Sequence, residues 1–186
     1  MPAVILDACG LLNLYASGRF VPILTALRHD WYVPAAVERE ALQYRQPDPD
    51  DPEKLIILPI DLTPALEGGV LSRCACEGEV EFALYTNLAA RIGDDGESMG
   101  IAIAKCRGWA VVTDDKKARR IAQELGVSVL ATTEIMKQWA SIARPPAHEL
   151  SEALEAIERF AHFQPGRGAL EYDWWVASIR PRPEES

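Results

Sequence analysis

Two adjacent acids, Asp114 and Asp115, stand between the apolar run "WAVVT" and four nearby cations. Asp7 follows the apolar run "AVIL" near the N-terminus in the same way. Both runs have the length and composition of strands that are buried on both faces of a sheet. Because ligands bind beyond the carboxyl ends of parallel strands, we expect these three acids to approach one another.

Further acids lie where helices are expected to begin. Glu97 falls in the first turn of an expected helix, where the helix dipole favours negative charge. Glu38 and Glu40 lie in a segment of good helix formers, and two residues turn about 200° along a helix. At most one of that pair can therefore face the same site. Each acid alone also has a simpler explanation, since Glu97 or Asp7 could be only a helix cap and Glu38 or Glu40 an exposed partner of Arg39.

Several carboxylates at one sheet edge would repel one another and raise their pKa values unless a cation neutralised them. Mg²⁺ or Mn²⁺ fits best, because hard ions take oxygen ligands and no His stands at these positions. Thr113 could support the site by donating a hydroxyl hydrogen bond. The candidate metal ligands are Asp7, Glu97, Asp114 and Asp115.

Short apolar runs alternate with helical patterns through residues 1–144. Strands are expected near 3–6, 31–34, 55–60, 109–113 and 127–130, and a mainly helical stretch is expected over 63–91. This alternation predicts an α/β fold of three layers, α/β/α, with a mostly parallel central sheet. After the breaker "RPPAHE", residues 145–186 are expected to form a C-terminal helix and tail that pack on the core or extend from it. Trp174 and Trp175 favour packing on the same chain.

Composition limits the possible functions. With 186 residues, 48% of them hydrophobic and 25% charged, the chain is expected to form one main globular domain. Its formal charge of −9 would repel a polyanion, so contact with nucleic acid needs a local basic patch or a metal. We find neither an export signal nor an apolar stretch that could span a membrane, and we expect a cytoplasmic protein with reduced cysteines.

The ordered segments "ILDACGLL", "VPAAVEREAL" and "DDGESMGIAIAKCRGWAVVTDDKKARRIA" resemble the PIN-domain ribonucleases, the family that includes the VapC-like toxins. The resemblance covers about residues 3 to 140. It implies a metal-dependent endoribonuclease with an RNA substrate, and by family habit a homodimer and an antitoxin partner. The position of Cys9 is one where many relatives carry a small polar residue that supports the site. The catalytic residues that the resemblance implies are Asp7, Glu40, Glu97 and Asp115, with Asp114 beside it.

We therefore expect ions held by Asp7, Glu97 and Asp115 to promote hydrolysis of RNA phosphodiester bonds, with Glu40 in support. Four cations could either hold RNA phosphate next to the ions or merely offset the nearby acids, and they are Lys116, Lys117, Arg119 and Arg120. One alternative is a non-catalytic protein of the same fold whose acidic edge binds a basic partner. Another is a phosphate-transferring enzyme with Asp7 as acceptor, but the chain has neither a D-x-D motif nor a suitably placed strand-end Lys to assist. Dinucleotide binding is disfavoured, because no G-x-G-x-x-G follows a strand.

Overall fold

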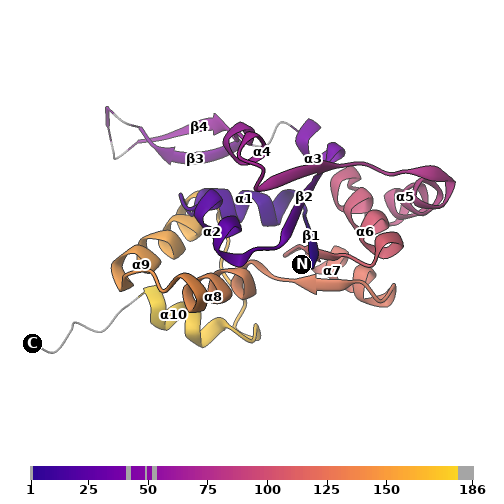
Figure 1. Cartoon of the computed structure of the whole chain (residues 1–186). Helices are drawn as coiled ribbons and strands as arrows, with labels where there is room; N and C mark the ends of the chain where they lie inside the picture. The colour runs from indigo at the N-terminus through magenta and orange to yellow at the C-terminus, as the bar shows by residue number, and fades with distance from the viewer. Residues whose placement is uncertain (1, 41–42, 49, 52–53, 180–186) are drawn as a thin grey trace, which may run out of the picture.

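The centre of the molecule is a sheet of five parallel strands in the order β5-β2-β1-β6-β7. It is seen in a computed structural model that describes residues 2–40, 43–48, 50–51 and 54–179. Helices cover both faces, so the predicted three-layer α/β fold is confirmed (Figure 1). The strands are β1 (Ala3–Leu6), β2 (Asp30–Pro34), β5 (Leu71–Cys74), β6 (Ala110–Val112) and β7 (Ser128–Leu130).

Alternate residues of the strands feed two separate cores. Val4 and Leu6 pack on one face of the sheet, and Ile5 packs on the other, as the two-residue period of a strand requires. The first face is covered by α1 (Ala8–Ala16), α2 (Phe20–Leu27), α8 (Thr132–Ala143) and α9 (Ala147–Ala156). The second is covered by α3 (Ala35–Arg39), α5 (Gly78–Ile92), α6 (Asp95–Arg107) and α7 (Lys116–Glu124).

One expected strand lies in a different sheet. Residues 55–60 were expected in the central sheet, but β4 (Leu55–Pro59) pairs only with β3 (Gln43–Pro47), in an antiparallel hairpin that projects from the core (Figure 1). In β4, exposed residues alternate with half-buried ones, so the strand is not enclosed on both faces. The predicted helix over 35–42 ends at Arg39 in the structure, and residues 41–42 lie outside the described part of the chain.

The strand that occupies the sheet edge instead is β5, within the stretch expected to be mainly helical. That stretch contains α4 (Thr63–Glu67), β5 and α5. Only Leu71 and Cys74 of β5 are buried, while Ser72 and Arg73 between them are exposed. A strand of four residues with two polar members carries no apolar run, which is why the pattern did not reveal it.

The C-terminal segment packs on the core. It continues from α9 into the π-helical turn η1 (Ile157–Ala161) and ends in α10 (Tyr172–Ile179). Leu154, Ile157 and Trp175 are fully buried in the same cluster as residues of α1 and α8, so Trp175 packs on its own chain as expected. A domain boundary at residue 144 stays a prediction. Among the described residues, no helix combines the length and the apolar character needed to cross a membrane.

Candidate active site

The strand order reverses between β1 and β6. From β1 the chain builds outward through β2 to β5, and then returns to the other side of β1 to form β6 and β7. Such a reversal opens a crevice at the carboxyl ends of the two strands, where ligands bind in parallel α/β sheets. Asp7 directly follows β1, and Asp114 and Asp115 lie just beyond β6. The backbone N–H of Asp7 donates to the carbonyl of Val112 at 3.2 Å, which fixes the two strand ends side by side.

Asp7 is completely buried at this crevice. It caps α1, with Oδ1 accepting a hydrogen bond of 2.7 Å from the N–H of Gly10. The thiol of Cys9 donates to its two carboxylate oxygens at 3.3 and 3.4 Å, and Thr113 contributes a side-chain hydrogen bond. Burial nevertheless raises the pKa of Asp7 to about 7, because the desolvation penalty outweighs these hydrogen bonds. Cys9 and Thr113 thus both hydrogen-bond to Asp7.

Gly10 permits this arrangement by its lack of a side chain. A Cβ atom at Gly10 would lie 2.9 Å from Cγ1 and 3.0 Å from the carbonyl oxygen of Val112. Only glycine therefore allows the first turn of α1 to rest on the end of β6 without displacement. That contact positions Asp7, the N-cap residue of α1, at the crevice.

Glu97 reaches the same crevice from the first turn of α6. Its backbone N–H donates at 2.8 Å to Oδ1 of Asp94, the N-cap residue of this helix. The pKa of Glu97 is raised to about 8, first by burial and then by the negative charges of Asp7, Asp115 and Asp94. The carboxylate of Glu97 therefore interacts electrostatically both with Asp7, which follows β1, and with Asp115, which follows β6.

Asp115 is exposed at the beginning of α7. Its Oδ1 caps α7 by accepting hydrogen bonds from the N–H groups of Lys117 and Ala118, at 2.8 and 2.7 Å. Its own N–H donates to the hydroxyl of Thr113 at 3.2 Å. Among the described residues, no side chain or backbone group donates to its Oδ2. Asp115 is thus fixed by one oxygen and can offer the other to a ligand.

Asp114 has a different environment. Its Oδ2 accepts hydrogen bonds from the side-chain amide of Asn13, at 2.9 Å, and from the hydroxyl of Thr132. Its Oδ1 accepts from the N–H of Thr132 at 3.1 Å. Burial raises the pKa of Asp114, and these hydrogen bonds oppose the rise. Because both oxygens are engaged, Asp114 joins α1 to α8 and is the weaker candidate for metal binding.

The two acids after β2 have different surroundings, and only Glu40, the residue that follows the end of α3, lies near Glu97. The carboxylate of Glu40 lies over the first turn of α6, close to Gly96 and hydrogen-bonded to its backbone. Burial and the charge of Asp94 raise the pKa of Glu40. Glu38 instead forms an ion pair of 2.7 Å with Arg73 of β5. The suggestion that Glu38 simply pairs with Arg39 is wrong, because β5 supplies the cation.

The four predicted RNA-binding cations have unequal environments. The ammonium of Lys117 donates to the carbonyl of Ile92 at 2.9 Å. Arg119 donates through one nitrogen to the carbonyl of Thr113 at 2.9 Å. Arg120 lies 3.7 Å from Glu124, and Lys116 lines a groove together with Asp114. Lys117 therefore acts first as a tether between α7 and the end of α5.

Some residues of the site were not singled out from the sequence. Asp94 carried a usable signal, because an Asp three residues before Glu97 is a typical helix cap. Asn13 and Thr132 carried none, since their role depends on contacts with Asp114 across 101 and 18 residues of chain.

The donor set suits a hard cation, although the acids do not form a ready ligand cage. Among the described residues, no three His, Cys, Asp or Glu side chains are grouped closely enough to hold a metal. Two features favour a cation nonetheless: the donors are all carboxylate oxygens, and the pKa values of Asp7 and Glu97 are raised to about 7 and 8. The half-buried Glu97 and exposed Asp115 would have to turn their carboxylates toward Asp7.

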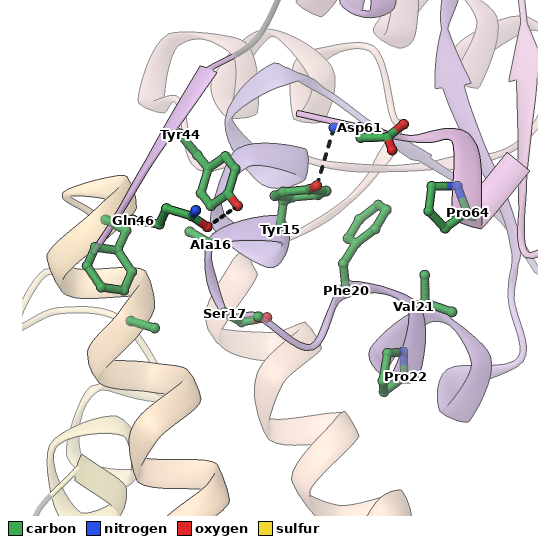
Figure 2. A pocket seen from close by; sticks show the side chains of 14 residues that line it. Tyr15, Ala16, Ser17, Phe20, Val21, Pro22, Tyr44, Gln46, Asp61 and Pro64 are labelled. Carbon is green, nitrogen blue, oxygen red and sulfur yellow. Dashed lines mark hydrogen bonds between the residues drawn. The ribbon is translucent and has the colours of Figure 1, made fainter. Parts of the chain in front are cut away.

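A separate hollow of about 490 Å³ lies at the far end of α1 (Figure 2). The rings of Tyr15, Tyr44 and Phe20 line it, with the Tyr15 and Tyr44 ring centroids 4.9 Å apart. Asp61 supplies the one ionisable charge among its lining residues in the described chain. This hollow therefore suits apolar groups and would repel a phosphate, which leaves the carboxyl edge of the sheet as the candidate active site.

Comparisons of the chain with protein-family models, with curated proteins and with solved structures find no match.

Proposed function

We propose that the protein is a divalent-metal-dependent endoribonuclease whose active site is the acidic crevice between β1 and β6. The observation that supports the proposal is that Asp7 and Asp115 follow the two strands between which the strand order reverses, and that the charges of both raise the pKa of Glu97. RNA as the substrate rests on the resemblance of the ordered acidic motifs to PIN-domain ribonucleases.

Each residue has a role that follows from its environment. Asp7, Glu97 and Asp115 would hold Mg²⁺ or Mn²⁺, with Glu40 next to Glu97 as further support. When bound, such an ion supplies Lewis-acid stabilisation of the phosphoryl oxygens and activation of water. Asp7 and Glu97 have pKa values near neutrality, so binding a cation there would release protons at pH 7. Asp114 keeps α1 and α8 in place around the crevice.

A second function is kept open by the lack of a preformed three-ligand group in the described chain. The same acids could bind a basic segment of a partner protein, such as an antitoxin, without catalysis. A cytoplasmic location and a homodimer also belong to this set of proposals, because both come from the sequence.

The function is tested by incubating the wild-type protein with structured and single-stranded RNAs in Mg²⁺ or Mn²⁺, with EDTA as a control. We expect metal-dependent cleavage that Asp7→Asn lowers at least 100-fold while the variant stays folded, as judged by its circular dichroism spectrum. Glu152→Gln, an exposed acid of α9, is the matched control and should cleave normally. Equal cleavage by Asp7→Asn and wild type would rule out the carboxylate mechanism.

A further inference from the structure

A groove of about 530 Å³ opens directly beside the acidic crevice. Asp114 belongs to its lining and is the direct neighbour of Asp115, so the groove borders the acidic crevice. One wall is the beginning of α7, with Lys116 and Arg119, and the beginning of α8. The opposite wall is the segment 163–171 between η1 and α10, which has no helix or strand. The groove is therefore built jointly by the core and the C-terminal segment.

The C-terminal wall is held in place by specific contacts. The Phe163 ring packs edge-on against Trp175 with centroids 5.8 Å apart, and Trp175 is completely buried. Gln164 and Trp175 both donate hydrogen bonds to the carboxylate of Glu158, at 3.2 and 2.9 Å. Because these anchors lie in the core and in η1, the wall has a defined position relative to the acids.

We propose that this groove receives one unpaired nucleotide of the RNA strand, next to the bond that is cleaved. The inference rests on the proposed ribonuclease function, and it makes the C-terminal segment a determinant of substrate choice. The groove has the volume of pockets that enclose small molecules, which suits a single unpaired nucleotide. Single-stranded RNA is recognised in this way, with bases taken into pockets and phosphates held outside.

The chemistry of the two walls matches the two parts of a nucleotide. Lys116 and Arg119 stand on the side of the acids, where they can hold the phosphate. Phe163, Pro165 and Leu170 supply apolar surface on the other side. Leu170 is 89% exposed, so its side chain is accessible to a base of the RNA.

Three acids, Asp114, Glu134 and Glu171, also line the groove, and two of them are held by hydrogen bonds within the protein. The carboxylate of Asp114 accepts hydrogen bonds from Thr132 and Asn13. The carboxylate of Glu134 accepts a hydrogen bond of 2.7 Å from the N–H of Ala131. Glu171 is buried at the base of the groove and belongs to the C-terminal wall.

Gly168 offers a way to close the groove without disturbing the fold. It lines the groove, a Cβ atom there would meet nothing within 4 Å, and its backbone is not in the left-handed region. Gly168→Phe should therefore fold normally and fill the groove. Ala177→Phe is the matched control, because Ala177 is exposed on α10 and does not line the groove.

The test measures binding of a fluorescently labelled single-stranded RNA octamer, and of the same sequence in a duplex, by fluorescence anisotropy. An Asp7→Asn background prevents cleavage during the measurement. We expect the single strand to bind at least 10-fold more tightly than the duplex. Gly168→Phe should weaken single-strand binding at least 10-fold, whereas Ala177→Phe should leave it unchanged. Lys116→Ala should also weaken binding and reduce the slope of log affinity against log salt by roughly 0.7.

The outcomes separate this inference from the function on which it rests. No binding of the octamer, or equal binding by Gly168→Phe and Ala177→Phe, would contradict nucleotide binding in the groove even if the wild type cleaves RNA. Equal affinity for duplex and single strand would overturn it as well. Groove-dependent binding by a protein whose wild type cleaves no RNA would support the groove and refute the nuclease.

Discussion

The side-chain amide of Asn13 in α1 donates a 2.9 Å hydrogen bond to Oδ2 of Asp114, a residue 101 positions further along the chain. This hydrogen bond distinguishes Asp114 from Asp115, although the sequence alone does not show which of the two is the better metal ligand. Asp114 is committed to holding helices together, whereas its neighbour Asp115 is held through one carboxylate oxygen.

The two neighbouring acids should therefore respond differently to the same substitution. Asp115→Asn preserves a good N-cap for α7, so we expect little change in stability but at least a 10-fold loss of cleavage. Asp114→Asn disturbs the hydrogen bonds with Asn13 and Thr132 and should lower the free energy of unfolding by roughly 1–3 kcal/mol. Urea denaturation and RNA cleavage of both variants check this. The reverse pattern would make Asp114 the ligand.

Stability should depend on pH because Asp7 and Glu97 bind protons more tightly in the folded state. Their pKa values rise from 3.8 and 4.5 to about 7 and 8. Between about pH 4 and 8 the folded protein thus holds more protons than the unfolded chain, and the free energy of unfolding falls as pH rises. For the fully buried Asp7 this amounts to about 4 kcal/mol.

The measurement is the melting temperature of the EDTA-treated protein from pH 5 to pH 8. Wild type should lose stability over this range, and Asp7→Asn should lose much less. Glu152→Gln serves again as the matched control and should follow the wild type. A wild-type curve that is flat or rises toward pH 8 would show that the two acids are already neutralised within the protein.

Gly10 should be intolerant of even a methyl group. In Gly10→Ala the added Cβ would contact Val112 at 2.9 Å and push the first turn of α1 away from β6. We expect a loss of roughly 1–3 kcal/mol in the free energy of unfolding, together with a loss of cleavage larger than the unfolded fraction explains. Ser141→Ala, at an exposed position of α8 away from the groove, is the control. Unchanged activity in Gly10→Ala would show that the position of Asp7 is not critical.

Glu40 and Glu38 form a matched pair for testing the second acid. Glu40→Gln removes a charge next to Glu97 and should reduce cleavage, though less than Asp7→Asn does, because Glu40 only supports the site. Glu38→Gln weakens an exposed ion pair with Arg73 and should change cleavage little and stability by less than about 1 kcal/mol. Cleavage rates at fixed metal concentration distinguish the two; a larger effect from Glu38 would contradict the assignment.

The fold class was readable from the sequence because the inner strands are short apolar runs between helical patterns. Val4 to Leu6 and Val111 to Val112 are buried on both faces, so their composition identifies them without tertiary information. The edge strand β5 and the hairpin of β3 and β4 were missed or misassigned, since partly exposed strands carry mixed polarity. Their pairing is decided by neighbours distant in sequence.

The site was partly readable for a related reason. The positions of Asp7 and Asp115 follow from the strand ends, and that of Glu97 from a helix start. The difference between Asp114 and Asp115 does not, because it depends on Asn13 and Thr132. The groove could not be predicted from the sequence either. Its C-terminal wall lies next to α7 and α8 because Trp175 is buried in the core, a contact between segments distant in the chain.

The central claim is that the uncompensated acids of the crevice form a divalent-cation site, and titration with Mn²⁺ followed by electron paramagnetic resonance tests it most directly. At pH 7.5 we predict saturable binding of one or two ions by the wild type, with at least a 10-fold loss of affinity in Asp7→Asn and none in Glu152→Gln. Proton release on binding should accompany it. Absence of bound Mn²⁺ at millimolar concentration, or equal binding by Asp7→Asn, would contradict the metal site and favour the interaction protein.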